Sequence, residues 1–142
     1  MIYFPDLSNI GIDLNEIDPS NVIHSHVVIH DQVKIGKNCK IQSFAFIPNG
    51  VEIEDSVFIG PHVCFTNDPK MDIVPQGEFT PSKTIVKKGA RIGANACIRA
   101  GVTIGEGAII GMGSVVLQDV GDNETWFGNP ARKKSPFKYE MK

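Results

Sequence analysis

Aliphatic residues recur at every sixth position through most of this chain. One series runs from Ile23 to Phe65 and a second from Val86 to Val116, and every member of both is Ile, Val or Phe. The residue two places before each member is small or β-branched, apart from Asn21 at the start. Because six is an even number, both positions can face one side of an extended chain. The pattern predicts short strands rather than α-helices, whose period is 3.6 residues.

The residue that follows the aliphatic position is often glycine: Gly36, Gly60, Gly93, Gly105 and Gly111. We interpret these glycines as turn residues with positive φ, which a residue without a Cβ adopts at no steric cost. A backbone that turns every six residues builds a three-sided coil of about eighteen residues, a parallel β-solenoid. The expected fold is therefore all-β. Since a thin rod of this length buries little surface per residue, we expect it to associate with copies of itself.

The two series divide a single predicted domain, spanning residues 1–142, into four parts. The first solenoid tract is expected over residues 21–65, an extruded loop over 66–85, a second tract over 86–118 and a short tail over 119–142. A loop on a rigid scaffold is a usual place for a binding or catalytic site, although an ornamental insertion is the alternative. The tail is rich in basic residues, which fits either a lid for a phosphate-bearing ligand or solvated chain.

Composition excludes several classes of function. The formal net charge is −2, with 42% hydrophobic and 21% charged residues, so no basic surface argues for nucleic acid. Three cysteines without a C-x-x-C pair fit free thiols in a reducing compartment. The chain has neither an apolar run of membrane-spanning length nor the basic start of a signal peptide. We expect a cytoplasmic protein that binds neither nucleic acid nor a membrane.

Several segments resemble a known family. The hexads, the single loop and GNPAR at 128–132 resemble the hexapeptide-repeat acyltransferases. CKIQ at 39–42, VFIGPHVCFTND at 57–68 and VKKGARIGANACIRAGVTIG at 86–105 are similar to the nucleotide-sugar N-acetyltransferases within it. The resemblance implies a left-handed parallel β-helix and a homotrimer with acetyl-CoA between adjacent subunits. It also implies acetylation of an amino group, most often the 3-amino group, of a dTDP- or UDP-linked amino sugar made for bacterial surface polysaccharides.

The start of the loop separates amine from hydroxyl acceptors. Related sugar O-acetyltransferases carry T-G-H-P there, with the histidine as general base, whereas this chain has TNDP at 66–69. A hydroxyl depends strongly on such a base, but an amine with a pKa of roughly 8 is already partly neutral at pH 7. We therefore predict that Asn67 orients an acceptor amine. His62, just before the loop, is retained as a second catalytic candidate.

Eighteen-residue columns suggest further site residues. Asp31, Asn49 and Asn67 should form one polar ridge suited to sugar hydroxyls, and His26 and His62 should share a column with Phe44 between them. Asp68 and Lys70 complete the substrate-binding candidates. The resemblance implies that coenzyme A is bound by Ala94, Met112, Gly113, Leu117, Gln118, Arg132 and Lys133. Of these, Arg132 is the expected phosphate partner because a guanidinium grips phosphate in a fixed fork.

Three alternatives remain beside the N-acetyltransferase hypothesis. A sugar O-acetyltransferase would share the fold and the donor. A carbonic anhydrase built on the same coil binds zinc between subunits through three histidines, but the four histidines here lack the paired spacing of that family, so no metal is expected. A non-catalytic scaffold would bind no acetyl-CoA.

Overall fold

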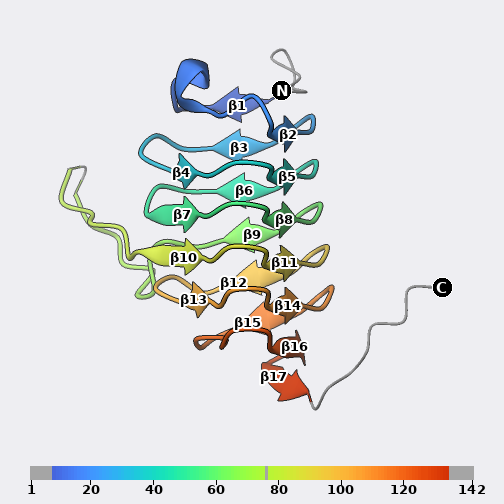
Figure 1. Cartoon of the computed structure of the whole chain (residues 1–142). Helices are drawn as coiled ribbons and strands as arrows, with labels where there is room; N and C mark the ends of the chain where they lie inside the picture. Colours follow the sequence, from blue (N-terminus) through green and yellow to red (C-terminus); the bar gives the residue numbers. More distant parts are fainter. Residues whose placement is uncertain (1–7, 76, 135–142) are drawn as a thin grey trace.

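The chain coils into a parallel β-solenoid of about six turns (Figure 1). It is known from a computed structural model that describes residues 8–75 and 77–134. Two-residue and three-residue strands stack into three sheets that form the sides of a prism. This is the parallel β-solenoid that the hexads predicted, and it is consistent with the left-handed β-helix that the family resemblance implied.

Successive strands along the chain belong to the three sheets in turn. The seven-stranded sheet contains β2 (Val22–Ile23), β5 (Lys40–Ile41), β8 (Phe58–Ile59), β11 (Arg91–Ile92), β14 (Ile109–Ile110), β16 (Thr125–Gly128) and β17 (Ala131–Lys134). The six-stranded sheet contains β1 (Asn9–Ile10), β3 (Val28–Ile29), β6 (Phe46–Ile47), β9 (Cys64–Phe65), β12 (Cys97–Ile98) and β15 (Val115–Val116). The four-stranded sheet contains β4 (Lys34–Ile35), β7 (Val51–Ile53), β10 (Thr84–Val86) and β13 (Thr103–Ile104).

Both hexad positions form the core, as predicted. The aliphatic members from Ile23 to Val116 are buried, with Ile35 half-buried, and so are the small residues two places earlier. The exception to the sequence rule, Asn21, is also fully buried. Its Nδ2 donates to the Gly36 oxygen at 2.8 Å and its Oδ1 accepts from the Cys39 nitrogen at 2.7 Å. Asn21 thereby satisfies two backbone groups at the top of the stack, which is why a polar side chain is tolerated inside.

The interpretation of the repeated glycines was wrong in its cause. The left-handed φ occurs two positions later in each turn, at residues such as His26 (φ 60°), Asn95 (φ 61°) and Gly113 (φ 69°). The glycines that directly follow the aliphatic residues need space instead. A Cβ on Gly93 would lie 2.6 Å from the Met112 nitrogen of the next coil. One on Gly60 would likewise lie 2.7 Å from the Ala94 nitrogen.

Two features extend the solenoid beyond the predicted hexads. At its N-terminal end, β1 pairs with β3, and a short 3₁₀ helix (Leu14–Glu16) follows it. At the other end, β16 pairs with β14 and then turns into the antiparallel strand β17. The first half of the predicted tail is therefore a hairpin that extends the seven-stranded sheet, and residues 135–142 of that tail lie outside the described residues.

Candidate functional site

Three rows of turns join the sheets, and the candidate residues occupy two of them. The first corner leads from the seven-stranded to the six-stranded sheet and includes His62. The second corner leads from the six-stranded to the four-stranded sheet and includes Asn67, where the loop leaves the stack. Strands on either side of the loop are paired 33 residues apart, as Cys64 with Cys97, instead of 18. The loop thus adds 15 residues to one coil without shifting the register of the others.

At the second corner, Asn49 and Asn67 lie next to each other on one ridge, as their eighteen-residue spacing predicted. Nδ2 of Asn67 donates to Oδ1 of Asn49 at 2.7 Å and to the Asn49 backbone oxygen at 3.1 Å. Both amide hydrogens are therefore used, and the Asn67 Oδ1 must face away from these two acceptors. Among the described residues none donates a hydrogen bond to that Oδ1. Asp31 occupies the same turn position one coil earlier and is exposed.

The backbone on both sides of the loop is anchored near Asn67. The Ser82 nitrogen donates to the Asn67 oxygen at 2.9 Å, and the Thr84 nitrogen donates to the Gly50 oxygen at 2.9 Å. The Thr66 hydroxyl accepts from the Ala100 nitrogen at 2.9 Å, which fixes the start of the loop on the coil below. Asn67 is consequently held at the neck of the loop, where the chain leaves the solenoid.

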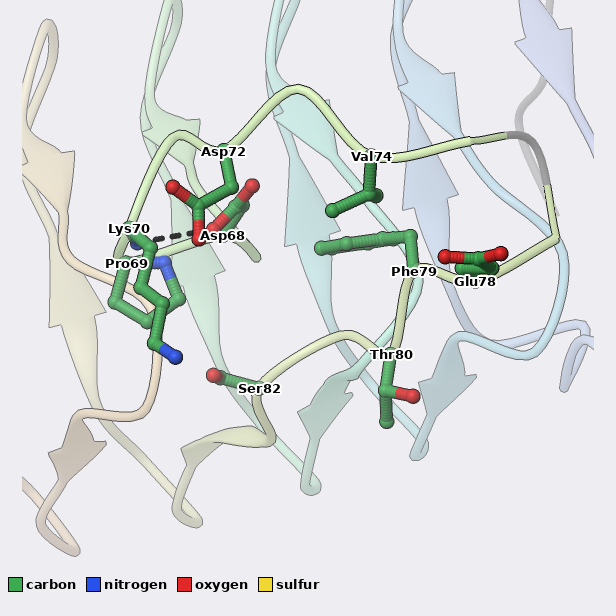
Figure 2. Close-up of a pocket in the computed structure, with 9 residues that line it drawn as sticks. All are labelled: Asp68, Pro69, Lys70, Asp72, Val74, Glu78, Phe79, Thr80 and Ser82. Atoms are coloured by element: carbon green, nitrogen blue, oxygen red, sulfur yellow. Dashed lines mark hydrogen bonds between the residues drawn. The ribbon is translucent and has the colours of Figure 1, made fainter.

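The loop encloses a cavity of about 200 Å³ beside this neck (Figure 2). In the view of Figure 2, Asp68, Lys70 and Asp72 lie toward one end of the lining, and Val74 and Phe79 lie toward the other. The lining residues are Asp68, Pro69, Lys70, Asp72, Val74, Glu78, Phe79, Thr80 and Ser82. The lining includes three carboxylates and one ammonium group, so its formal charge is negative, and Val74 and Phe79 add apolar surface. Of these residues, only Asp68 and Lys70 were predicted from the sequence to bind substrate.

Asp68 has a structural task at the entrance of the loop. Its Oδ1 accepts from the Lys70 nitrogen at 2.9 Å and from the Met71 nitrogen at 3.0 Å, which forms a side-chain-closed turn. The turn-forming role that an Asn-Asp-Pro sequence permits for Asn67 therefore falls to Asp68. The Lys70 side chain reaches into the cavity toward Ser82 (Figure 2).

At the first corner, the predicted column of rings is confirmed. His26, Phe44 and His62 stack face to face with 4.8 Å between successive ring centroids and interplanar angles of 14° and 10°. All three have a left-handed φ, so their side chains project from equivalent points of successive turns. His62 is exposed and its ring orientation is fixed by Phe44. Below it in the column stand Asn95 and then Gly113.

Three of the predicted coenzyme A residues lie lower on the same corner. The Gly113 nitrogen donates to the Ala94 oxygen at 2.8 Å, so Ala94 and the Met112–Gly113 turn are adjacent, as their spacing predicted. The Met112 side chain is 70% exposed. A Cβ at Gly113 would meet nothing within 4 Å, so the surface beside this turn is open to an extended ligand.

Within one chain, the candidates do not form a single cluster. Leu117 and Gln118 follow β15 at the second corner, on the side of Asn67, whereas Ala94 and Met112 are at the first. His62 and Asn67 are five positions apart in the chain, so at most roughly 16 Å can separate them. The sequence already indicates that the two residues occupy different corners, because one precedes β9 and the other follows it.

The basic residues of the C-terminal hairpin are partly engaged. The Lys133 Nζ lies 3.5 Å from Oε1 of Glu124, and Arg132 donates from Nη1 to the Ala131 oxygen at 2.9 Å. Arg132 is exposed on β17, and the Lys134 Nζ lies 4.8 Å from the centroid of the Phe127 ring. The guanidinium can therefore reach a phosphate without breaking an ion pair that the described residues form.

The cysteines have the properties of structural thiols. All three are free, and burial raises the pKa of both Cys39 and Cys64. A thiol with a raised pKa is a poor nucleophile near neutral pH. In the described part of the chain, no group of three or more His, Cys, Asp and Glu is arranged to hold a metal ion. The same residues include no helix long and apolar enough to cross a membrane.

Comparison with known proteins gives a family and several relatives. The family model for bacterial transferase hexapeptide (six repeats) matches residues 15–49, 32–67 and 83–118. A dTDP-3-amino-3,6-dideoxy-alpha-D-galactopyranose 3-N-acetyltransferase of Aneurinibacillus thermoaerophilus is 49% identical over 52 residues, which are 37% of this chain and 27% of the relative.

Two solved structures share the fold over most of this chain. A mutant of perosamine N-acetyltransferase from Caulobacter crescentus, in complex with CoA and GDP-perosamine, has a TM-score of 0.66 at 25% identity and covers 84% of this chain. A hexapeptide-repeat acetyltransferase from Vibrio cholerae O1 biovar eltor, complexed with acetyl coenzyme A, has a TM-score of 0.63 at 27% identity and covers 82%. This chain covers 55% and 64% of those two proteins, and so spans only part of their length.

Proposed function

Because this chain belongs to the bacterial hexapeptide-repeat transferases, we propose that it moves the acetyl group of acetyl-CoA to the amino group of a nucleotide-linked amino sugar. The observation that carries the proposal is the fixed amide of Asn67. Asn49 holds both of its hydrogens and leaves Oδ1 as an acceptor at the neck of the loop. An acceptor oxygen suits a neutral amine, which has hydrogens to donate and a lone pair to aim.

The reaction needs positioning more than it needs a base. The neutral nitrogen attacks the thioester carbonyl, the new N–C bond forms, the C–S bond breaks, and the departing thiolate takes the proton that the nitrogen loses. A hydrogen bond from the amine to Oδ1 of Asn67 directs the nitrogen lone pair toward the thioester, and orientation of this kind contributes strongly to rate. His62 is a weaker candidate in this scheme, since the amine is already partly neutral.

The loop cavity is the proposed site for the sugar ring. Its three carboxylates can accept hydrogen bonds from hydroxyl and amino groups of the sugar and repel the pyrophosphate of the nucleotide, which orients the substrate with its sugar toward the cavity. Val74 and Phe79 supply an apolar wall that suits a deoxy position. The name of the Aneurinibacillus relative, a 3-N-acetyltransferase for a dTDP-3-amino-3,6-dideoxysugar, supports a 3-amino deoxysugar linked to dTDP or UDP. Asp31 and Asn49 remain candidates for contacts with its hydroxyl groups.

For acetyl-CoA, the open first corner is the proposed track of the pantetheine arm. Ala94, Met112 and Gly113 offer backbone groups beside an unobstructed surface. Arg132 and Lys133 at the end of the same face of the prism are the proposed phosphate partners. Two of the solved relatives hold CoA or acetyl coenzyme A.

A homotrimer would bring the two corners together. The outward strand positions of the six-stranded sheet, from β3 down, are apolar in the described chain: Val28, Phe46, Cys64, Cys97 and Val115. The seven-stranded sheet carries Lys40 and Arg91 at such positions, and the four-stranded sheet carries Lys34 and Glu52. If three six-stranded sheets face a common axis, the first corner of one protomer approaches the second corner of the next. The proposed site is then shared between subunits. In this proposal the protein acts in the cytoplasm, in the synthesis of surface polysaccharides.

An acyl-transfer assay across dTDP- and UDP-linked amino and hydroxy sugars tests the function. We expect acetylation of an amino sugar only, and Asn67→Ala should lower kcat by about a hundredfold without changing the oligomer or the KM for acetyl-CoA. His62→Ala is the matched comparison and should have the milder effect. If His62→Ala abolishes turnover, Asn67→Ala is silent and a hydroxyl is acetylated, the protein is instead an O-acetyltransferase.

A further inference from the structure

We infer that the Asn49–Gly50 turn is a positioning element that sets the direction of the Asn67 amide and seats both ends of the loop. This inference rests on the proposed function and names the residues that make Asn67 effective. The turn belongs to the coil above the loop, between β6 and β7. It meets the loop through the contacts described next, and Asn49 can be substituted separately from Asn67.

The contact between Asn49 and Asn67 decides whether the oxygen or the nitrogen of the Asn67 amide points toward the proposed substrate. The oxygen and the nitrogen of an amide have nearly the same shape, so only hydrogen-bond partners choose between the two orientations. Asn49 presents two acceptors, its Oδ1 at 2.7 Å and its backbone oxygen at 3.1 Å, both to the Nδ2 of Asn67. A reversed amide would set its oxygen against both of them. Asn49 therefore keeps Oδ1 of Asn67 directed outward.

The second set of contacts seats the returning end of the loop on Gly50. A Cβ at Gly50 would lie 2.8 Å from the Ser82 oxygen and 3.0 Å from the Pro81 Cβ, so the loop returns directly over this residue. The φ of +93° also favours glycine here. The Gly50 oxygen accepts from the Thr84 nitrogen at 2.9 Å, which starts β10. Both the outgoing and the returning chain are thus fixed by two adjacent residues.

The solenoid itself does not require an amide at this corner. The equivalent position one coil earlier is Asp31, which is exposed, and the position below the loop is Ala100, which has no polar side chain. Both turns form without a side-chain bond of the Asn49–Asn67 kind among the described residues. The Asn49 side chain is therefore explained by what it does to Asn67 and not by a need of the coil.

Substitutions at Asn49 test the inference in the full-length protein with the best amino-sugar substrate. Asn49→Leu removes the side-chain acceptor and should lower kcat by about fivefold to tenfold, the worth of one net hydrogen bond, with the KM for acetyl-CoA unchanged. Asn49→Asp keeps an acceptor oxygen and should restore kcat on the alkaline plateau. In the Asn67→Ala background, Asn49→Leu should cause no further loss, because the two act as a unit.

A matched control and the opposing outcomes separate this inference from the function. Ser20→Ala removes another bond between coils eighteen residues apart, which the Asn38 nitrogen donates to Ser20 Oγ at 2.8 Å, far from the loop. It should leave kcat unchanged. Three outcomes would overturn the positioning role while leaving the proposed function intact: a normal kcat in Asn49→Leu, a multiplicative loss in the double variant, or a change confined to the KM for the sugar. A silent Asn67→Ala would instead overturn the proposed role of Asn67. Circular dichroism and the oligomeric state of each variant report whether it folds.

Discussion

Replacing Gly93 by asparagine tests why glycine follows the aliphatic residue in this repeat. Asparagine tolerates a left-handed φ better than other residues with a side chain, so it would serve well if the glycine were needed for its backbone angle. The structure indicates a need for space instead. A Cβ at Gly93 would lie 2.6 Å from the Met112 nitrogen and 3.0 Å from the Ile110 oxygen, all of it backbone of the next coil. Gly93→Asn should therefore be at least as harmful as Gly93→Ala.

The expected loss follows from the contacts between these coils. Ordinary van der Waals contact begins at 3.4 Å, so the backbones must separate locally by about 0.8 Å, which stretches the 2.8 Å bonds from Gly93 to Ile110 and from Gly113 to Ala94. Each is worth about 1 kcal/mol net, so the loss is about 1–3 kcal/mol. Larger residues such as Gln42 occupy this turn position in other coils, so the fold can accommodate a side chain there, which limits the cost.

Thermal unfolding of both variants provides the measurement. A chain of 142 residues has an unfolding entropy of about 0.3 kcal/mol/K, so Tm should fall by about 3–10 °C. Gly113→Asn is the control, because Gly113 has a φ of +69° and open space around its Cβ. Its Tm should change by less than about 3 °C, since asparagine already occupies the position above it in the column. A Gly93→Asn variant as stable as the parent, with Gly93→Ala destabilised, would refute the reasoning.

Four further predictions concern the core, the proposed subunit face of the six-stranded sheet, the C-terminal hairpin and the dependence of stability on pH. Phe65→Ala should destabilise the protein by about 3–5 kcal/mol in chemical denaturation, because Phe65 is fully buried under the loop. Phe46→Glu places a charge on the apolar sheet and should yield inactive monomers in light scattering. Arg132→Ala should raise the KM for acetyl-CoA with little change in kcat, since a phosphate remote from the thioester is bound equally in ground and transition states; an unchanged KM would contradict the phosphate role. Hydrogen bonds from Lys83 to Glu52 and from Trp126 to Glu124 hold both carboxyl pKa values below their ordinary 4.5. Their contribution to stability is therefore complete above pH 4.5 and lost as the pH falls through the lowered values, so Tm should decline less steeply below that pH in a Glu52→Gln, Glu124→Gln variant.

The six-residue period predicted most of the scaffold because the repeat acts through side chains that the sequence displays directly. It located the core, the columns and the point where the loop leaves. It missed β1 and the β16–β17 hairpin, since neither follows the hexads, and it gave the glycines the wrong cause because the distance between neighbouring coils cannot be read from one coil.

The spacing of the candidate residues predicted which of them are neighbours but not how their side chains are oriented. That Asn49 and Asn67 are neighbours follows from their spacing, whereas the direction of the amide depends on two acceptors that only coordinates reveal. The contribution of Val74, Phe79 and Ser82 to the cavity depends on the path of the loop, for which the sequence has no period to follow.

The loop also has a consequence for how the chain folds and opens. Within each tract, a strand needs only 18 residues of chain to reach its partner, but where β9 meets β12 it needs 33. Closing the longer segment costs about 0.5 kcal/mol more in chain entropy, and in a stack with only nearest-neighbour coupling this junction becomes the weakest link. The two tracts should therefore behave as separate cooperative blocks. Slow hydrogen exchange should persist within each block while the amides of Ser82 and Thr84, which bridge the junction, exchange first. A fluctuation that separates the two tracts at this junction would displace the loop and interrupt the proposed reaction without unfolding any coil.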